Sequence, residues 1–151
     1  MLFRSHGNYG ADGEVINGDS NNVPGYATLT MSGQGPFIWA NPTTDVRALQ
    51  TFAGNSRIAS GWYTFSNMSF DINLTDGNTH QFALYCLDFD TTSRAERVDI
   101  LDAGTNAVLD TRTISSFNGG QYLVWNLHGH VIVKVTLTGG ANAVASGLFF
   151  R

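Results

Sequence analysis

The stretch His80 to Asp90, HQFALYCLDFD, carries the pattern that decides the fold. Its apolar side chains fall on both parities, with Phe82, Leu84 and Cys86 on one and Ala83, Tyr85, Leu87 and Phe89 on the other. A half-buried strand alternates apolar with polar residues, whereas a strand covered on both faces reads as a continuous apolar run. We therefore predict a central strand that is buried on both faces.

The sequence on either side alternates with period two. Phe70, Ile72 and Leu74 alternate with polar neighbours, and so do the apolar residues of Val131 to Thr138, which is typical of half-buried strands. Further extended runs lie at Tyr26 to Met31, Phe37 to Trp39, Asp45 to Thr51, Arg57 to Trp62, Arg97 to Leu101, Val108 to Ile114, Tyr122 to Leu127 and Val144 to Phe150. The pattern predicts about eleven strands.

Short strands separated by Gly, Asn and Asp clusters at intervals of about ten residues are typical of a sandwich, jelly roll or barrel. Thr44 to Phe52 is the only stretch with the composition of a helix, and it fits a strand equally well. We predict an all-β fold, an antiparallel β-sandwich of jelly-roll type.

Composition excludes several classes of protein. The 151 residues suit one domain, and the 42% hydrophobic content is too high for a disordered chain. The net charge is −4 and Lys134 is the only lysine, so no basic stripe is present to bind nucleic acid. No run approaches the ~18 apolar residues of a membrane span, so no membrane insertion is expected. Cys86, the single cysteine, is interpreted as a small buried hydrophobe.

The linkers divide into two groups if every strand reverses direction. Tight turns at Ser32 to Gly35, Phe52 to Ser56, Thr75 to Asn78, Ala103 to Asn106 and His128 to Gly129 would then share one end. Longer loops at Asn17 to Gly25, Ala40 to Thr44, Tyr63 to Met68, Asp90 to Ala95, Ser115 to Gly120 and Gly139 to Asn142 would share the other. Functional residues concentrate on loops held by a rigid scaffold, so the second end is the predicted site.

Several motifs resemble a bacterial C-terminal module found in secreted multidomain proteins. They are YGAD (Tyr9 to Asp12), TDVRAL (Thr44 to Leu49), ALYCLDFD (Ala83 to Asp90), VDILD (Val98 to Asp102), VLDTRT (Val108 to Thr113), QYLVWN (Gln121 to Asn126) and GANAVASGLFF (Gly140 to Phe150). The strand order is also similar to the galactose-binding-like jelly roll of many carbohydrate-binding modules. The resemblance implies a secreted or cell-surface accessory module within a larger protein, with a lectin-like affinity for an oligo- or polysaccharide.

Residues 8–151 are the predicted module, and residues 1–7 are predicted to be a non-native or disordered leader. MLFRS at the start of the chain looks like translated sequencing-adapter DNA, which would suggest a metagenomic fragment.

A sugar site needs an aromatic platform beside planar hydrogen-bonding groups, because sugar rings combine apolar faces with hydroxyls. Trp62 and Tyr63 lead into a loop that contains Phe65, and Trp39 stands just before Asn41. The loop count brings these residues to the rim that carries Arg94 and Asn118. The predicted glycan-binding residues are Asn41, Trp62, Tyr63, Phe65, Arg94 and Asn118. Alternatively, Trp39 and Trp62 cap the core and only Tyr63 and Phe65 are exposed.

Two groups of residues suggest a metal. Asp12, Glu14 and Asp19 concentrate oxygen ligands near the N-terminus, which is compatible with a structural Ca²⁺, although Asp and Asn are also ordinary turn formers. His128 and His130 would share a face of an extended segment, but Gly129 is more simply the residue of a hairpin turn. No cofactor is required by the sequence.

Asp88 and Asp90 are the strongest candidates for acid and base catalysis, because two residues of equal parity point the same way from a strand. Arg94 and Arg97 follow closely, so we interpret the group as an ion-pair cluster that shapes the loop. The sequence favours a non-catalytic carbohydrate-binding module. Two alternatives remain, a structural or adhesive sandwich without a sugar site, and a small hydrolase or metal-dependent enzyme that uses these carboxylates or the His128 and His130 pair.

Overall fold

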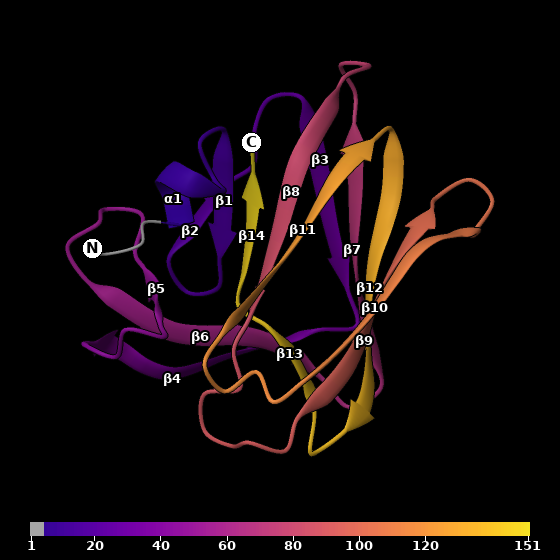
Figure 1. Cartoon of the computed structure of the whole chain (residues 1–151). Coiled ribbons are helices and arrows are strands. Elements are labelled where there is room, and N and C mark those ends of the chain that lie inside the picture. The colour runs from indigo at the N-terminus through magenta and orange to yellow at the C-terminus, as the bar shows by residue number, and fades with distance from the viewer. Residues whose placement is uncertain (1–4) are drawn as a thin grey trace.

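Three antiparallel sheets make up residues 5–151, the part of the chain that the structure, a computed structural model, describes (Figure 1). The first sheet contains, in spatial order, β11 (Gln121–His128), β8 (Thr79–Cys86), β14 (Gly147–Phe150), β1 (Gly13–Ile16) and β2 (Ser20–Asn22). The second contains β10 (Val108–Ser115), β9 (Ala95–Asp102), β12 (His130–Gly139), β7 (Asn67–Leu74) and β3 (Ala27–Ser32). The third contains β13 (Ala143–Ala145), β6 (Arg57–Thr64) and β4 (Gly35–Thr43), and β5 (Leu49–Gln50) also pairs with β6.

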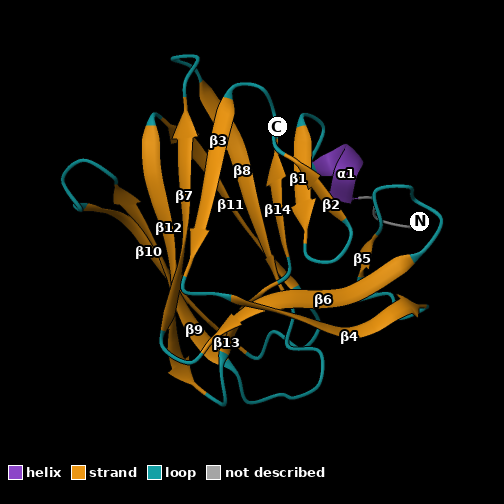
Figure 2. Ribbon diagram, turned by 180° about the vertical axis from the view of Figure 1, so that it is seen from behind, coloured by secondary structure: helices purple, strands orange, loops and turns teal. Residues whose placement is uncertain are grey.

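The predicted all-β antiparallel sandwich is confirmed. The first two sheets face each other, and the third crosses below them (Figures 1 and 2). A four-residue helical turn, α1 (Ser5–Asn8), lies beside β1 and β2. Residues 1–4 of the predicted leader lie outside the described residues.

Strand β8 is buried on both faces, as predicted. Phe82, Leu84 and Cys86 belong to the main core between the first two sheets. Ala83 and Tyr85 belong to a second cluster on the other side of the same sheet, and Cys86 is free and fully buried. The run is apolar throughout because alternate side chains of β8 pack into two different hydrophobic clusters.

Two of the predicted extended runs differ in the structure. Thr44 to Phe52 is mainly a loop around the short β5, in which the Asp45 carboxylate accepts a hydrogen bond from the Arg47 backbone N–H at 2.9 Å. The run Val144 to Phe150 is divided between β13 and β14, because Ser146 donates its backbone N–H to the Tyr85 carbonyl at 2.8 Å where the chain passes between sheets.

The register sorts the connections into two ends. Residue pairs Gly139–Ala95 and Gln121–Cys86 bring segments 87–94, 115–120 and 139–142 to one end, here called the loop end. Pairs Val131–Asp102 and His128–Thr79 bring segments 75–78, 103–107 and 128–129 to the other, the turn end (Figure 1).

The alternating count was wrong for the N-terminal connections. Ser32 pairs with Ser69, so the turn after β3 belongs to the loop end, and Ala27 pairs with Leu74, so the segment before β3 reaches the turn end. The stretch Asn17 to Gly25 was counted as one loop but contains β2. The strands of the third sheet do not run between the two ends, so counting them as reversals misplaced the turn after β3.

Candidate functional site

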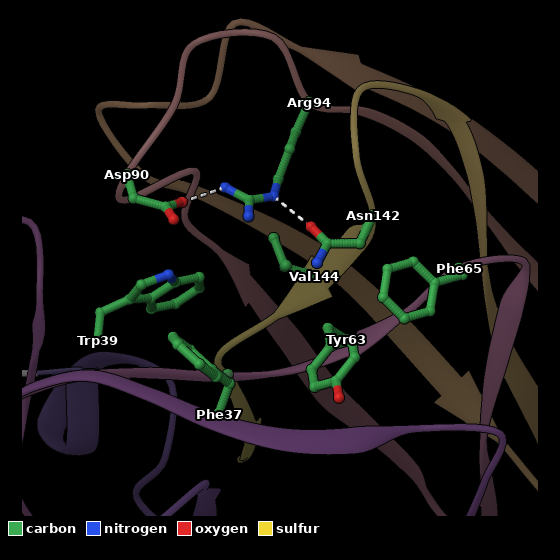
Figure 3. A pocket seen from close by; sticks show the side chains of 9 residues that line it. Phe37, Trp39, Tyr63, Phe65, Asp90, Arg94, Asn142 and Val144 are labelled. Atoms are coloured by element: carbon green, nitrogen blue, oxygen red, sulfur yellow. Dashed lines mark hydrogen bonds and ion pairs between the residues drawn. The ribbon is translucent and has the colours of Figure 1, made fainter.

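A pocket of about 230 Å³ opens at the loop end, where the third sheet meets segments 87–94 and 139–142 (Figure 3). Its lining comprises Phe37, Trp39, Gly61, Tyr63, Phe65, Asp90, Arg94, Asn142 and Val144. Aromatic side chains gather on one side of it, and Asp90, Arg94 and Asn142 lie together on the opposite side (Figure 3).

The aromatic side is built by two paired strands. Phe37 of β4 pairs with Gly61 of β6, Tyr63 of β6 pairs with Gly35, and Trp39 lies at a register irregularity between Ile38 and Ala40. The Phe37 and Trp39 ring centroids are 5.8 Å apart, and those of Tyr63 and Phe65 are 5.6 Å apart, both in edge-on contact. Phe37 is 51% exposed and Phe65 is 72% exposed, so the aromatic surface is open to solvent.

Gly61 lines the pocket and leaves space where another residue would place a Cβ. A Cβ at this position would lie 3.0 Å from the Ala145 carbonyl oxygen and 3.5 Å from Cη2 of Trp39. The first distance is too short for an undisturbed contact, and the second shows that the indole lies directly over the glycine. A residue with a Cβ at this position would therefore require a shift of the Ala145 carbonyl.

Arg94 fixes the polar side. Its Nη1 donates to Asp88 Oδ1 and to Asp90 Oδ1, both at 2.5 Å, and its Nε donates to Asn142 Oδ1 at 2.7 Å. The guanidinium carbon lies 5.7 Å from the centre of the Trp39 ring, so the polar and aromatic sides touch. Within residues 5–151 no partner is assigned to Arg94 Nη2, which points toward Trp39 and Val144 in Figure 3.

Asp88, which is buried and does not line the pocket, also binds the Arg94 guanidinium. Its side chain is fully buried, it accepts hydrogen bonds from Thr91 Oγ1 at 2.6 Å and from the Arg94 backbone N–H at 3.1 Å, and it pairs with the guanidinium. Burial raises the pKa of Asp88, but the hydrogen bonds from Thr91 and Arg94 lower it more, so the pKa lies below the usual 3.8. The predicted ion-pair cluster is confirmed with Arg94, whereas Arg97 pairs with Asp99 at 3.0 Å.

A second buried acid supports the wall of the pocket. Glu96 is fully buried, and its Oε1 accepts the backbone N–H of Val144, a lining residue, at 2.9 Å. Its Oε2 lies 3.8 Å from Cys86 Sγ. Burial raises the pKa of Glu96 to about 8, so this carboxyl is largely protonated at neutral pH.

We expect Glu96→Gln to flatten the pH dependence of stability. The folded-state pKa of about 8 exceeds the ordinary 4.5, so the stabilisation is complete below about pH 4.5 and is lost as the pH rises through about 8. At about 1.4 kcal/mol per pKa unit, Glu96 contributes on the order of 3 to 4 kcal/mol to the fall in stability between about pH 5 and pH 8. Gln keeps an oxygen for the Val144 N–H.

Urea unfolding of wild type and variant at the two pH values measures this effect. Glu14→Gln is the comparison variant. Burial raises the pKa of Glu14 only to about 7, so this substitution should reduce the pH dependence of stability in the same direction but by less. An unchanged pH slope in Glu96→Gln would contradict the role given to this carboxyl.

The structure brings together three of the predicted glycan-binding residues, Tyr63, Phe65 and Arg94, in one pocket. Trp62 points the opposite way from its strand, is 6% exposed and packs on Phe70 in the core. Asn41 lies toward the far end of β4, where Ala40 pairs with Ala59 and Thr43 with Arg57. Neither residue lines the pocket.

Asn118 is at the loop end but outside the pocket lining, and its carbonyl accepts a hydrogen bond from Arg47 Nη1 at 2.9 Å. The lining residues absent from the predicted set are Phe37, Trp39, Asp90, Asn142 and Val144. Phe37 and Trp39 are two residues apart on a predicted strand, and this spacing could have indicated that both side chains lie on the same face. The loop count brought Asn142 and Arg94 to the same end, but nothing in the sequence showed that these two side chains, 48 residues apart, are in contact.

The residues considered as metal ligands are dispersed. Asp12 accepts a hydrogen bond from the Tyr26 hydroxyl, Glu14 is buried beside His6, and Asp19 accepts the Phe52 backbone N–H. His128 and His130 belong to strands of different sheets, because Gly129 reverses the chain with a positive φ of 71°. Across residues 5–151 there is no group of three His, Cys, Asp or Glu side chains that could hold a metal.

No family model matches the sequence, and no curated protein matches it. Among solved structures, the fold is similar to the carbohydrate-binding module of Cellvibrio mixtus lichenase 5A in complex with cellotriose. The identity is 11%, the alignment covers 93% of this chain and 96% of that one, and the TM-score is 0.47.

It is also similar to the family 32 module of C. perfringens NanJ in complex with galactose, at 11% identity, 83% and 94% coverage and a TM-score of 0.44. A family 35 module from Clostridium thermocellum aligns at 11% identity, 80% and 91% coverage and a TM-score of 0.41. These likenesses concern the antiparallel β-sandwich described above. Among the described residues, no helix is long and apolar enough to cross a membrane.

Proposed function

We propose that the chain is a non-catalytic carbohydrate-binding accessory module of an extracellular bacterial protein, and that the pocket at the loop end binds the sugar. The observation that carries this proposal is the contact between an exposed aromatic surface and a rigid group of planar polar side chains. A sugar ring offers an apolar face and equatorial or axial hydroxyls, so it needs both kinds of surface at once.

The aromatic side supplies the apolar surface. Phe37, Tyr63 and Phe65 flank the opening, and two of them are more than half exposed without covering any other part of the core. Exposed aromatic surface in a concave site is typical of ligand binding. The structural or adhesive alternative would be favoured by a flat rim, and this end is hollowed.

The polar side supplies hydrogen bonds that need no ordering on binding. Arg94 is 5% exposed and is held by Asp88, Asp90 and Asn142, so its free nitrogen is fixed before a ligand arrives. Side chains already locked in place lose little conformational entropy when they bind. Beside the Arg94 guanidinium, the second Asp90 oxygen can accept a hydrogen bond and the Asn142 amide nitrogen can donate one (Figure 3).

The size of the pocket limits the ligand. Its 230 Å³ is below the roughly 300 to 1,000 Å³ of sites for drug-sized ligands, so it suits one sugar ring with the rest of the glycan outside. Such a contact buries little area, and we expect a Kd on the order of 10 µM to 1 mM. Several copies or further domains in a larger protein would raise the avidity.

The catalytic alternative finds less support in the geometry. Asp88 is fully enclosed by Thr91 and Arg94, and Asp90 shares the same guanidinium, so both carboxylates serve to hold the arginine. Most glycoside hydrolases need two carboxyl groups that flank the scissile bond.

Tyr63→Ala is expected to weaken sugar binding by at least about tenfold, which corresponds to about 1.4 kcal/mol, because it removes the central part of the platform. A glycan array with the purified chain selects the ligand, and isothermal titration then compares the variants. Phe65→Ala should also weaken binding. Phe52→Ala removes an aromatic side chain that is also exposed, at 51%, but contacts His6 outside the pocket, so it is the control.

Loss of binding in Phe52→Ala, or in Asn78→Ala at the turn end, with Tyr63→Ala unaffected would place the site elsewhere. Binding by none of the array glycans, with and without calcium, would overturn the proposed function itself.

A further inference from the structure

The charge of the pocket limits which sugars it accepts, an inference that rests on the proposed function. Among the described residues, Asp90 and Arg94 are the only charged side chains in the pocket lining, and the buried Asp88 pairs with the same guanidinium. One guanidinium between two carboxylates leaves a net charge of −1. Arg94 therefore offers directional hydrogen bonds but no uncompensated positive charge.

The other arginines near this end add no free cation. Arg47 is paired with Asp45 at 2.8 Å and Arg97 with Asp99 at 3.0 Å. Lys134 lies on β12 opposite Ser69 and Asp99, away from the lining residues. None of these three side chains therefore offers an unpaired cation to an anionic ligand in the pocket.

Asp90 is the residue that presents negative charge to a ligand. Its side chain is 48% exposed, whereas that of Asp88 is completely buried. One Asp90 oxygen binds Arg94, and the other has no assigned partner among residues 5–151. That second oxygen is an acceptor, so it can bind a sugar hydroxyl, which donates, and repels a carboxylate, which cannot.

Beside it lie two donors, Arg94 Nη2 and Asn142 Nδ2, on the same wall (Figure 3). Two adjacent ring hydroxyls match this arrangement, since one can accept from the arginine or the amide while its neighbour donates to Asp90. We propose that the pocket selects neutral sugars through a pair of adjacent hydroxyls and excludes the corresponding uronic acids, with Asp90 as the specificity-determining residue.

Matched pairs of methyl glycosides test this directly. Methyl galactoside with methyl galacturonide, and methyl glucoside with methyl glucuronide, differ only in a hydroxymethyl or a carboxylate at C6. Each is titrated into the full chain by NMR or calorimetry. We expect the preferred neutral sugar to bind at least about tenfold more tightly than its uronate, since like charges a few ångströms apart repel strongly in a partly desolvated site.

Asp90→Asn should reduce that ratio to about threefold or less by admitting the uronate, because the amide removes the like charge. Asp71→Asn is the matched control: it removes the same charge from a partly exposed carboxylate that is paired with His130 at the other end of the molecule, and the ratio should not change. Circular dichroism checks that each variant is folded.

A wild-type chain that binds the uronate as tightly as the neutral sugar would overturn this inference and leave the proposed function standing. So would an unchanged ratio in folded Asp90→Asn. Failure to bind either member of both pairs, together with a blank glycan array, would overturn both proposals.

Discussion

Asp88→Asn is expected to lower the free energy of unfolding by about 3 to 5 kcal/mol, the cost typical of breaking one partner of a buried ion pair. Asp88 is fully buried and accepts from Thr91, from the Arg94 backbone and from the Arg94 guanidinium. An asparagine would present N–H groups to some of these donors, and Arg94 would lose a charge partner in a place that is 5% exposed. Stability should fall, and the pocket should lose its fixed donor.

Asp90→Asn provides the matched comparison on the same arginine. Its side chain is 48% exposed, and an exposed ion pair contributes about 0 to 1 kcal/mol. Urea titration of both variants measures the difference. Equal, small costs would mean that Asp88 does not hold the loop. A stable Asp88→Asn variant that lost a measurable hydrolytic activity would instead favour the enzyme alternative.

Trp125→Ala is expected to cost about 3 to 5 kcal/mol, as is usual when a large buried aromatic is truncated. The indole is 7% exposed and stacks on Phe82 with centroids 6.2 Å apart. Its Nε1 donates to Asp110 Oδ2 at 2.7 Å, and the Arg112 guanidinium lies 4.4 Å above its ring. The side chain therefore joins β11 to β10, the neighbouring edges of the two large sheets.

Phe65→Ala is the control for this substitution, because a side chain that is 72% exposed should cost less than about 1 kcal/mol. Denaturant titration compares the two. If the costs were equal, Phe65 would be part of the folded core rather than a surface for ligand binding.

The strands that alternate clearly could be predicted from the sequence, because period two reports which face meets the core. Val131, Val133 and Val135 of β12 are buried as the alternation predicts. Strand β1 was not predicted because all four of its residues, Gly13–Ile16, are buried, so they show no alternation of apolar and polar side chains. Its partner β2 has the sequence Ser-Asn-Asn, which is typical of a turn. Ser32 to Gly35 was misplaced because the strands of the third sheet, which follow it, do not run between the two ends.

The site was partly predictable for a similar reason. Tyr63 and Phe65 follow a strong strand and are more apolar than a connection requires, and Arg94 stands beside two aspartates, so local sequence was sufficient for these. Asn142 accepts a hydrogen bond from Arg94, a long-range pairing that local sequence does not show. Trp62 is distinguished from its neighbour Tyr63 by parity alone, and the core faces Trp62.

The most direct test of the central claim is an NMR titration of the ¹⁵N-labelled chain with the strongest ligand from the glycan array. We predict that the largest saturable amide shifts fall at Gly61, Tyr63, Arg94 and Asn142, and that segments 75–78 and 103–107 do not respond. Saturable shifts confined to the turn end, with the pocket residues unchanged, would contradict the assignment of the sugar site.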